Sequence, residues 1–440
     1  MAISLPSDPA VREKCLRSMA SRAFLTVWEG AVRSGKTVWA LCAFALYVTR
    51  SPDSDFLLSA RTTATAETNC ITGEFGLLSL IPTAEYRTVG NVRMIRFRTA
   101  AGEKRIHVVG ASDIRSYMVI RGATFGGWMA DEVTMHDRRF VSEALNRTAM
   151  SHDRRHLWTL NPDDPGHWAY SEYIDRYEAM PEDERRELGG FAHFWFVPSD
   201  NPAMTPGMLL SLERQYPAGT PFHIRYVLGR RCVAEGRVYP FFGPPCMEEP
   251  PEGVRAEFAS IDFGSVHPTA MGWYGRKGGV WYKVAEWGPT PDESSRMTVS
   301  DYMDAFERET ARLGGIRRDR LTIDYGGGGE ALVREAERRR WFPVNPDKSV
   351  LDGIQATAMA LSSGLLRIAP SCARTIAELS TYHWKEGARG GETVPDKVRD
   401  DFADETRYMV STFIEPRMRR RRAEAGKRTA SCIKMHVTAR

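Results

Sequence analysis

Residues 30–37, GAVRSGKT, combine two glycines, a lysine and a threonine at a spacing that suits phosphate chemistry. Gly30, Gly35, Lys36 and Thr37 match the pattern G-x-x-x-x-G-K-S/T in full. In such a loop the backbone N–H groups surround phosphate oxygens, the lysine reaches the terminal phosphates and the hydroxyl contacts Mg²⁺. AFLTVWE before the loop predicts a strand and TVWALCAFALYV after it predicts a helix, which is the setting of a phosphate-binding helix N-terminus. These residues predict a nucleoside triphosphate site.

A pair of acids, Asp131 and Glu132, follows the apolar run in GGWMADEV. A triphosphatase needs a carboxylate for its Mg²⁺ and a group that orients the attacking water, and we assign these roles to Asp131 and Glu132 respectively. The run LWTLNP ends in Thr159 and Asn161, whose polar side chains suit sensing of the γ-phosphate.

Hydrolysis also benefits from a cation that stabilises the charge of the transition state. Arg121, in IRGATFGGWMADE, is one candidate and would act on its own site or on that of a neighbouring subunit. Arg33, inside the loop, is a competing candidate. A surface or salt-bridging role accounts for each arginine equally well, so the sequence leaves this choice open.

The C-terminal half offers acids for metal-dependent phosphodiester cleavage. Two Mg²⁺ or Mn²⁺ ions need several carboxylates held together, because hard cations prefer oxygen ligands. Asp262 in ASIDFG and Asp324 in LTIDYGGGG each close an apolar strand, so adjacent strands would bring both to one edge of a sheet. A single acid after a strand is more often a cap or a turn former. The prediction therefore depends on a third acid in the same domain.

The third acid is expected from a helix in DKVRDDFADETRYMVSTF. Asp400 and Asp404 share one helical face there, with Asp401 and Glu405 one step round. Competing sites are weaker: His152 and His156 in HDRRH have helical spacing but no third ligand, and we expect them to be surface residues. We find no serine or cysteine nucleophile.

Alternating patterns define the elements that must position these residues. From about residue 24 to 160, short apolar runs alternate with amphipathic stretches, which predicts buried parallel strands and crossover helices. Five prolines between 240 and 256 predict a domain boundary. Beyond it, the pattern predicts three sequential strands in EFASIDFG, TAMGWYG and VWYKVAEWG, a helix in SDYMDAFERETARLG capped by its serine or aspartate, a strand in RLTIDYGGGG, and helices near 330–340, 351–363 and 397–414.

The composition, 42% hydrophobic and 26% charged, is that of a globular protein, and 440 residues predict two domains. The seven cysteines are scattered without a C-x-x-C pair, so we expect free thiols. No stretch resembles a membrane helix or a signal peptide, and we expect an intracellular protein. Basic residues gather in RMRRRR at 417–422 and GKR at 426–428, in a tail that is either solvated or contacts DNA or a partner protein.

This ordered set of motifs resembles the large subunit of a tailed-bacteriophage terminase over nearly the whole chain. GAVRSGKT, IRGATFGGWMADEV and TLNP look like the family's phosphate loop, arginine-glycine segment with acidic strand, and coupling motif. SIDFGSVHPTA, TIDYGG and DDFADETRYMV look like its nuclease motifs. Matching the last motif through Arg407 and Tyr408 places the metal-binding acid at Asp404. The chain departs from the family by having Glu405-Thr406 where a small and an apolar residue are usual, and Asp401 where a histidine often lies.

The resemblance implies a P-loop ATPase domain of ASCE type with a central, mostly parallel sheet, followed by a ribonuclease H-like α/β nuclease domain. The implied boundaries are residues 1–238 for the ATPase domain, 239–257 for a proline-rich linker, 258–416 for the nuclease domain and 417–440 for the basic tail.

The implied function is ATP-driven packaging of double-stranded DNA into a procapsid, with cleavage of concatemeric DNA, in the host bacterial cytoplasm. The implied cofactors are ATP with Mg²⁺ and two Mg²⁺ or Mn²⁺ ions. The implied partners are double-stranded DNA, the portal protein, the small terminase subunit and further copies in a ring, and no membrane is expected. Two alternatives remain: a helicase-nuclease of DNA repair, for which residues 160–258 leave little room for a second motor domain, and a nucleotide switch with a non-catalytic second domain.

The predicted site residues fall into three sets. The nucleotide-binding set is Gly30, Arg33, Ser34, Gly35, Lys36, Thr37, Asp131 and Asn161. The catalytic set is Glu132, Arg121, Asp262, Asp324 and Asp404. The metal ligands are Thr37, Asp131, Asp262, Asp324, Asp404 and Asp401, and the sequence leaves open which of Asp400, Asp401 and Asp404 completes the second metal site.

Overall fold

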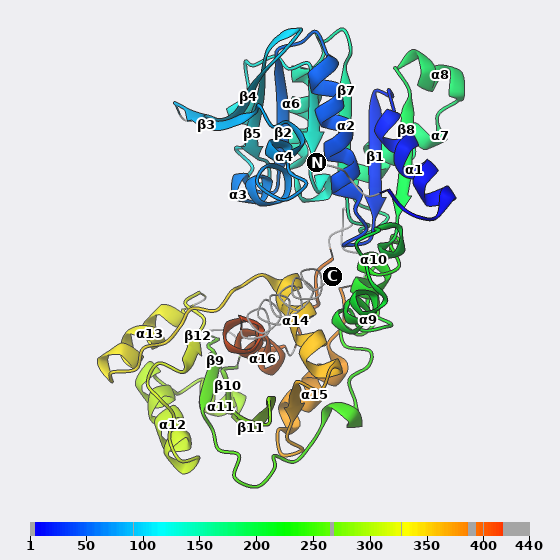
Figure 1. Cartoon of the computed structure of the whole chain (residues 1–440). Coiled ribbons are helices and arrows are strands. Elements are labelled where there is room, and N and C mark those ends of the chain that lie inside the picture. Colours follow the sequence, from blue (N-terminus) through cyan, green and yellow to red (C-terminus); the bar gives the residue numbers. More distant parts are fainter. Residues whose placement is uncertain are drawn as a thin grey trace, which may run out of the picture. The chain divides into compact units, whose positions relative to one another are not determined.

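The chain divides into two compact units in a computed structural model (Figure 1). The structure describes residues 5–90, 92–264, 268–326, 328–385, 393–398 and 400–416. The first unit contains the described residues up to 213 and residues 221–233, and the second contains residues 214–220 and the described residues from 234 onward. The proline-rich stretch lies within the second unit, and the boundaries given above stay a prediction. The basic tail, 417–440, lies outside the described residues.

The first unit is built on an eight-stranded sheet in the order β3-β4-β5-β2-β6-β7-β1-β8. Its strands are β1 (Leu25–Gly30), β2 (Asp55–Ala60), β3 (Glu85–Val89), β4 (Val92–Thr99), β5 (Gly102–Gly110), β6 (Gly127–Ala130), β7 (Arg155–Leu160) and β8 (Phe191–Phe196). From β5 to β8 in this order the neighbouring strands pair in parallel, whereas β3, β4 and β5 form antiparallel pairs. Because β7 lies between β1 and β6, it borders both the strand that leads to the glycine loop and the strand that leads to the acid pair.

Helices cover both faces of this sheet. Phe56 and Leu58 of β2 belong to one core with α1 and α2, and Leu57 belongs to a second core with α5 and α6. Burial on both faces explains why these strands are continuous apolar runs. The helices of this part of the chain are α1 (Pro9–Ala20), α2 (Lys36–Arg50), α3 (Thr63–Ala66), α4 (Leu77–Leu80), α5 (Tyr117–Ile120), α6 (Arg138–Arg147), α7 (Asp175–Ala179), α8 (Glu182–Glu187), α9 (Pro206–Gln215) and α10 (Pro221–Tyr226).

The second unit contains a five-stranded sheet in the order β12-β9-β10-β11-β13. Its strands are β9 (Phe258–Asp262), β10 (Ala270–Lys277), β11 (Val280–Trp287), β12 (Leu321–Ile323) and β13 (Leu366–Ile368). β9, β10 and β11 form consecutive antiparallel pairs, β12 pairs in parallel with β9, and β13 pairs in parallel with β11. Three sequential antiparallel strands, followed by alternating helices and strands, match the mixed α/β domain that the sequence predicts.

The two faces of this second sheet differ in chemistry. On one face Ile261 and Trp273 share an apolar core with α12 and α13. On the other face α16 packs against β9 and β10, where Ser260 hydrogen-bonds to its backbone. The helices are α11 (Pro291–Ser294), α12 (Val299–Arg312), α13 (Gly329–Arg338), α14 (Val350–Ser362), α15 (Ala373–Thr381) and α16 (Asp401–Met409), which continues into a π-helical turn, Val410–Ile414.

Two local predictions are wrong. The cap of α12 is Thr298, because it exchanges hydrogen bonds with Asp301 in a capping box, and Asp301 is therefore the partner acid inside the first turn. His156 is not a surface residue: it lies in β7, fully buried between the rings of Phe24 and Trp128. No disulfide joins the six cysteines in the described part of the chain, in agreement with the prediction. Among the described helices, none has the length and apolar character needed to cross a membrane.

Candidate functional site

The glycine loop leaves β1 at Gly30 and enters α2 at Lys36. Gly35 adopts a left-handed conformation with φ of 83°, which glycine allows without strain. Gly30 lies so close to β8 that a Cβ atom there would approach the carbonyl oxygen of Phe196 to 2.0 Å. Both glycines of the predicted pattern are thus required by the backbone itself. Arg33 also has positive φ, 60°, and its side chain is exposed.

Lys36 lies at the centre of this site with only 6% of its surface exposed. Its Nζ donates to Oδ1 of Asn161 at 2.7 Å and to the carbonyl oxygen of Ala31 at 3.2 Å. Burial lowers the pKa of Lys36 to about 8, although the nearby carboxylates of Glu132 and Asp131 act in the opposite direction. The structure therefore brings the loop lysine together with the polar residue that follows β7.

Asp131 and Glu132 follow β6 at the same edge of the sheet. Asp131, 1% exposed, accepts hydrogen bonds from Thr159 Oγ1 at 2.8 Å and Thr37 Oγ1 at 3.3 Å. Oε1 of Glu132 accepts from Nδ2 of Asn161 at 3.2 Å. Burial, followed by the charge of Asp131, raises the pKa of Glu132 above its usual value. Lys36, Asn161 and Glu132 thus form one chain of contacts beside the Thr37–Asp131 pair.

Two further predicted residues differ in their surroundings. Ser34 Oγ is buried and has no hydrogen-bond partner among the described residues. A buried donor without a partner is costly, and a phosphate oxygen is the acceptor that a loop of this kind provides for. Arg121 follows α5 with an exposed side chain, and no hydrogen bond or ion pair in the described part of the chain joins it to Glu132. The structure thus assembles all the predicted nucleotide-site residues except the two arginines' side chains.

The residue that precedes the loop is held by contacts that the sequence analysis missed. Glu29, the residue before Gly30, is fully buried, and Arg231 donates to both of its carboxylate oxygens at 3.0 Å. Tyr170 also donates to Glu29, at 3.0 Å, and its ring carries the Arg231 guanidinium 3.8 Å from the centroid. Although burial acts to raise it, the contact with His193 Nε2 at 3.0 Å and the hydrogen bonds from Arg231 hold the pKa of Glu29 below its ordinary value. The sequence did hold one sign of this arrangement, because Glu29 is a charged residue at the end of an otherwise apolar strand.

The acids of the second unit meet at one edge of its sheet. Asp262 ends β9 and Asp324 follows β12, and the parallel pairing of Ile261 with Ile323 places the two aspartates on neighbouring strands at the same level. Tyr408 of α16 donates to Oδ2 of Asp324 at 3.2 Å, and Lys348 pairs with its Oδ1 at 2.5 Å. Although burial acts to raise it, these contacts lower the pKa of Asp324.

α16 brings the remaining predicted acids to Asp262. Burial raises the pKa of Asp262 well above its usual range, and the charges of Asp404, Asp401 and Asp324 raise it further, in that order. Arg407 Nη2 pairs with Asp404 at 2.9 Å. Among the described residues, no three acidic, histidine or cysteine side chains are arranged closely enough to hold a metal ion. The oxygen donors suit Mg²⁺ or Mn²⁺, but two of the carboxylates turn to Lys348 and Arg407.

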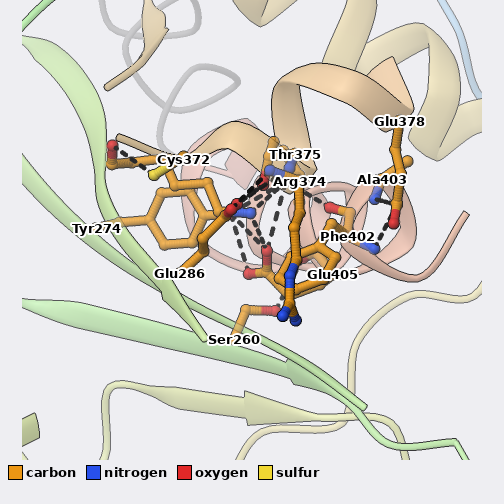
Figure 2. A network of polar contacts seen from close by, with 12 residues as sticks. Ser260, Tyr274, Glu286, Cys372, Arg374, Thr375, Glu378, Phe402, Ala403 and Glu405 are labelled. Atoms are coloured by element: carbon orange, nitrogen blue, oxygen red, sulfur yellow. Dashed lines mark hydrogen bonds and ion pairs between the residues drawn. The ribbon is translucent and has the colours of Figure 1, made fainter. Parts of the chain in front are cut away.

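Glu405, by contrast, points away from these acids into the protein interior. It and Lys283 of β11 have fully buried side chains and form an ion pair with Nζ and Oε2 2.5 Å apart. Tyr274 of β10 donates to Oε1 of Glu405 at 3.0 Å (Figure 2). Burial raises the pKa of Glu405, and Lys283 opposes this shift. The sequence analysis identified Glu405 only as a departure from the family and missed Lys283, because a lysine in an apolar strand gives no sign of its distant partner.

Two further glutamates cap helices in the same region (Figure 2). Glu378 of α15 accepts hydrogen bonds from the backbone N–H groups of Phe402 and Ala403, at 2.6 and 3.0 Å, in the first turn of α16. Glu286 of β11 accepts from the N–H groups of Arg374 and Thr375 at the start of α15. Such contacts satisfy N–H groups that have no partner within the helix.

A known family model matches the region that holds the nucleotide site. Residues 27–242 match the model described as "Terminase large subunit, T4likevirus-type, N-terminal". This part of the chain is therefore similar to the N-terminal domain of terminase large subunits. The matched region contains the glycine loop, the acid pair and the segment after β7. No curated protein matches the chain.

Solved structures of a large terminase from a thermophilic bacteriophage share the fold. In one crystal form, the large terminase has 23% sequence identity to this chain and a TM-score of 0.78, and the match covers 91% of this chain and 98% of that chain. The complex of that large terminase with ADP is 23% identical, with the same TM-score, and covers 91% of this chain and 99% of that chain. Its complex with ATP-gamma-S is 24% identical, with a TM-score of 0.75 and the same two coverages as the ADP complex. The predicted terminase fold class is confirmed.

Proposed function

We propose that this chain is the motor and endonuclease of a bacteriophage packaging machine, in which ATP hydrolysis drives double-stranded DNA into a procapsid. The match of residues 27–242 to the N-terminal model of terminase large subunits supports the proposal. The observation that carries it is the chain of contacts from Lys36 through Asn161 to Glu132, beside Thr37 and Asp131, at the edge where β1, β7 and β6 end. A lysine, a metal-binding pair and a carboxylate that orients water are the parts that triphosphate hydrolysis requires.

In the proposed reaction, ATP binds with Mg²⁺, which when bound neutralises charge on the phosphates. Lys36 and the loop N–H groups would hold the phosphates, with Ser34 as a further donor, and Thr37 and Asp131 would hold the metal ion. Glu132 orients the attacking water, and its raised pKa improves its match to a proton that is accepted near neutral pH. Arg121 or Arg33 supplies the transition-state cation. The ADP and ATP-gamma-S complexes of the similar large terminase support a nucleotide at this fold.

We further propose that Asp262, Asp324 and Asp404, with Asp401, hold two Mg²⁺ or Mn²⁺ ions for cleavage of DNA. Such ions, when bound, stabilise both the attacking and the leaving oxygen. Two observations support this role: Asp262 and Asp324 follow neighbouring parallel strands, and the charges of Asp404 and Asp401 act on Asp262. The proposed partners are double-stranded DNA, the portal protein, the small terminase subunit and further copies in a ring, in the host cytoplasm.

Lys36→Ala tests the motor. We expect DNA-stimulated ATP hydrolysis to fall by about 100-fold or more, because a preorganised charge on the transferring phosphoryl group is lost. Phosphate release, measured with and without DNA, gives the answer. Turnover that survives the substitution would remove the glycine loop from the mechanism, and wild-type hydrolysis that ignores DNA would favour a nucleotide switch.

Asp262→Ala tests the nuclease. Mn²⁺-dependent cutting of plasmid DNA is expected to fall by about 100-fold or more, since metal ions contribute several kcal/mol to such reactions. ATP hydrolysis should stay at the wild-type rate and serves as the control for folding. Unchanged cutting would show that the nuclease centre lies elsewhere.

A further inference from the structure

α16 begins in a run of acids, Asp400, Asp401, Asp404 and Glu405, and their distribution between the site and the interior depends on how the helix is rotated. An α-helix turns by about 100° per residue, so a rotation by one residue would bring Glu405 to the position of Asp404. Both are carboxylates, and the sequence of the helix alone does not distinguish them. A contact outside the helix must select between them.

The Lys283–Glu405 ion pair is the contact that fixes this rotation. Lys283 comes from β11, and Nζ contacts both Oε2 of Glu405, at 2.5 Å, and Oγ1 of Thr406, at 3.1 Å. Both charged side chains are fully buried. Any rotation that exposes Glu405 would leave the lysine charge buried without its partner, which is strongly unfavourable.

The strands beneath α16 are shaped to receive this carboxylate. Gly272 of β10 pairs in register with Ser260 of β9, and a Cβ atom at Gly272 would lie 2.5 Å from Oε1 of Glu405. Ser260 Oγ donates to the backbone carbonyl of Glu405 at 2.9 Å (Figure 2). Ser260 lies two residues before Asp262 on the same face of β9. The residue next to Asp404 is therefore tied to the strand that carries Asp262.

We propose that Lys283 is a positioning residue of the nuclease centre, because it draws Glu405 into the interior and so presents Asp401 and Asp404 to Asp262. The inference rests on the proposed nuclease function. A buried ion pair is often no more stabilising than an apolar pair of similar volume, so stability alone does not account for it. Its effect is to choose which acids of the run form the metal site.

Two variants test this inference in the full-length chain. Lys283→Met removes the cation that draws Glu405 into the interior, and Gly272→Ala keeps both charges but fills the space of the Glu405 carboxylate. We expect each to weaken Mn²⁺ binding by about 10- to 100-fold, the usual loss when a residue that orients metal ligands is removed. Binding is measured by electron paramagnetic resonance of free Mn²⁺, and cutting is measured as a function of Mn²⁺ concentration.

Matched controls separate positioning from general damage. Glu286→Gln alters the cap of α15 in the same network, Gly243→Ala adds a methyl group where no atom lies within 4 Å, and both should bind Mn²⁺ as the wild type does. Wild-type Mn²⁺ affinity in the folded Lys283→Met variant, or failure of both test variants to fold, would overturn the positioning role. A wild-type chain that neither binds Mn²⁺ nor cuts DNA would instead overturn the proposed nuclease function.

Discussion

Lys36 and Glu132 each bear a charge that burial opposes, and both contact the amide of Asn161. Their pKa values shift in opposite directions: burial lowers that of Lys36 to about 8 and raises that of Glu132. Each group is thereby brought nearer to its neutral form in the nucleotide-free chain. A phosphate bound at the loop would favour the ammonium form of Lys36.

This shift predicts a pH dependence of nucleotide binding. Below pH 8 Lys36 is already charged, whereas above pH 8 it is neutral in the free chain and must take up a proton when a phosphate binds. The apparent affinity for MgADP should therefore fall about tenfold for each pH unit above 8, up to the pKa of the bound state. Isothermal titration calorimetry in buffers of different ionisation enthalpy measures both the affinity and the proton uptake. A constant affinity from pH 7 to about 9.5 would contradict the lowered pKa.

At the scale of residues, the sequence predicted the parts whose spacing is local. The glycine loop and the acid pair are short motifs, and their side chains meet in the structure as their order suggested. Contacts between residues that lie far apart in the sequence were not predicted. Glu29 and Arg231, or Lys283 and Glu405, are joined only by folding, and nothing in the spacing of either residue specifies the other.

At the scale of elements, β1 and β8 approach each other closely enough to demand glycine at the end of β1. Gly30 pairs in register with Phe196, and the register continues along the whole of β1. This contact fixes the point from which the phosphate loop departs, so the loop's geometry depends on a strand that lies far away in the sequence.

Gly30→Ala should therefore destabilise the first unit. We expect the free energy of unfolding to fall by about 1–3 kcal/mol, the usual cost of forcing an extra methyl group into a packed site. Calorimetric unfolding of the full chain measures the effect. Gly207→Ala is the matched control, since Gly207 lies in α9 with no atom near its added Cβ, and alanine there should be neutral or stabilising by up to about 1 kcal/mol. Equal transitions in both variants would contradict the close approach.

The buried strands and long helices were predictable, but the peripheral elements were not. β2 and β7 are continuous apolar runs because both of their faces are covered. β3 and β4 were missed since β3 is largely exposed and β4 carries three arginines, which removes the apolar signal that identifies a strand. The cap at Thr298 was missed for a different reason, because Thr298, Ser300 and Asp301 are all suitable cap formers.

At the scale of the whole molecule, each unit is assembled around one sheet whose strand ends carry the acids. In both sheets a parallel pair of strands aligns the ends: β6 with β7 in the first, and β9 with β12 in the second. The chain length and the proline-rich stretch predicted two units, and the resemblance carried by the ordered motifs implied that their folds differ. The positions of the acids in the proposed nuclease centre depend on the packing of α16, which no sequence pattern describes.

The side-chain amide of Asn161 contacts both Lys36 and Glu132, so the two contacts depend on the same group. Its oxygen accepts a hydrogen bond from Lys36, and its nitrogen donates one to Glu132. A phosphate that binds the ammonium group of Lys36 would therefore compete with the amide oxygen of Asn161 and not with bulk water. If the Asn161 amide moved away from Lys36, its hydrogen bond to Glu132 would also weaken. Two residues further along the chain, Asp163 pairs with Arg225 at 2.8 Å. In the proposed motor, binding of ATP would therefore also weaken the contact between Asn161 and Glu132.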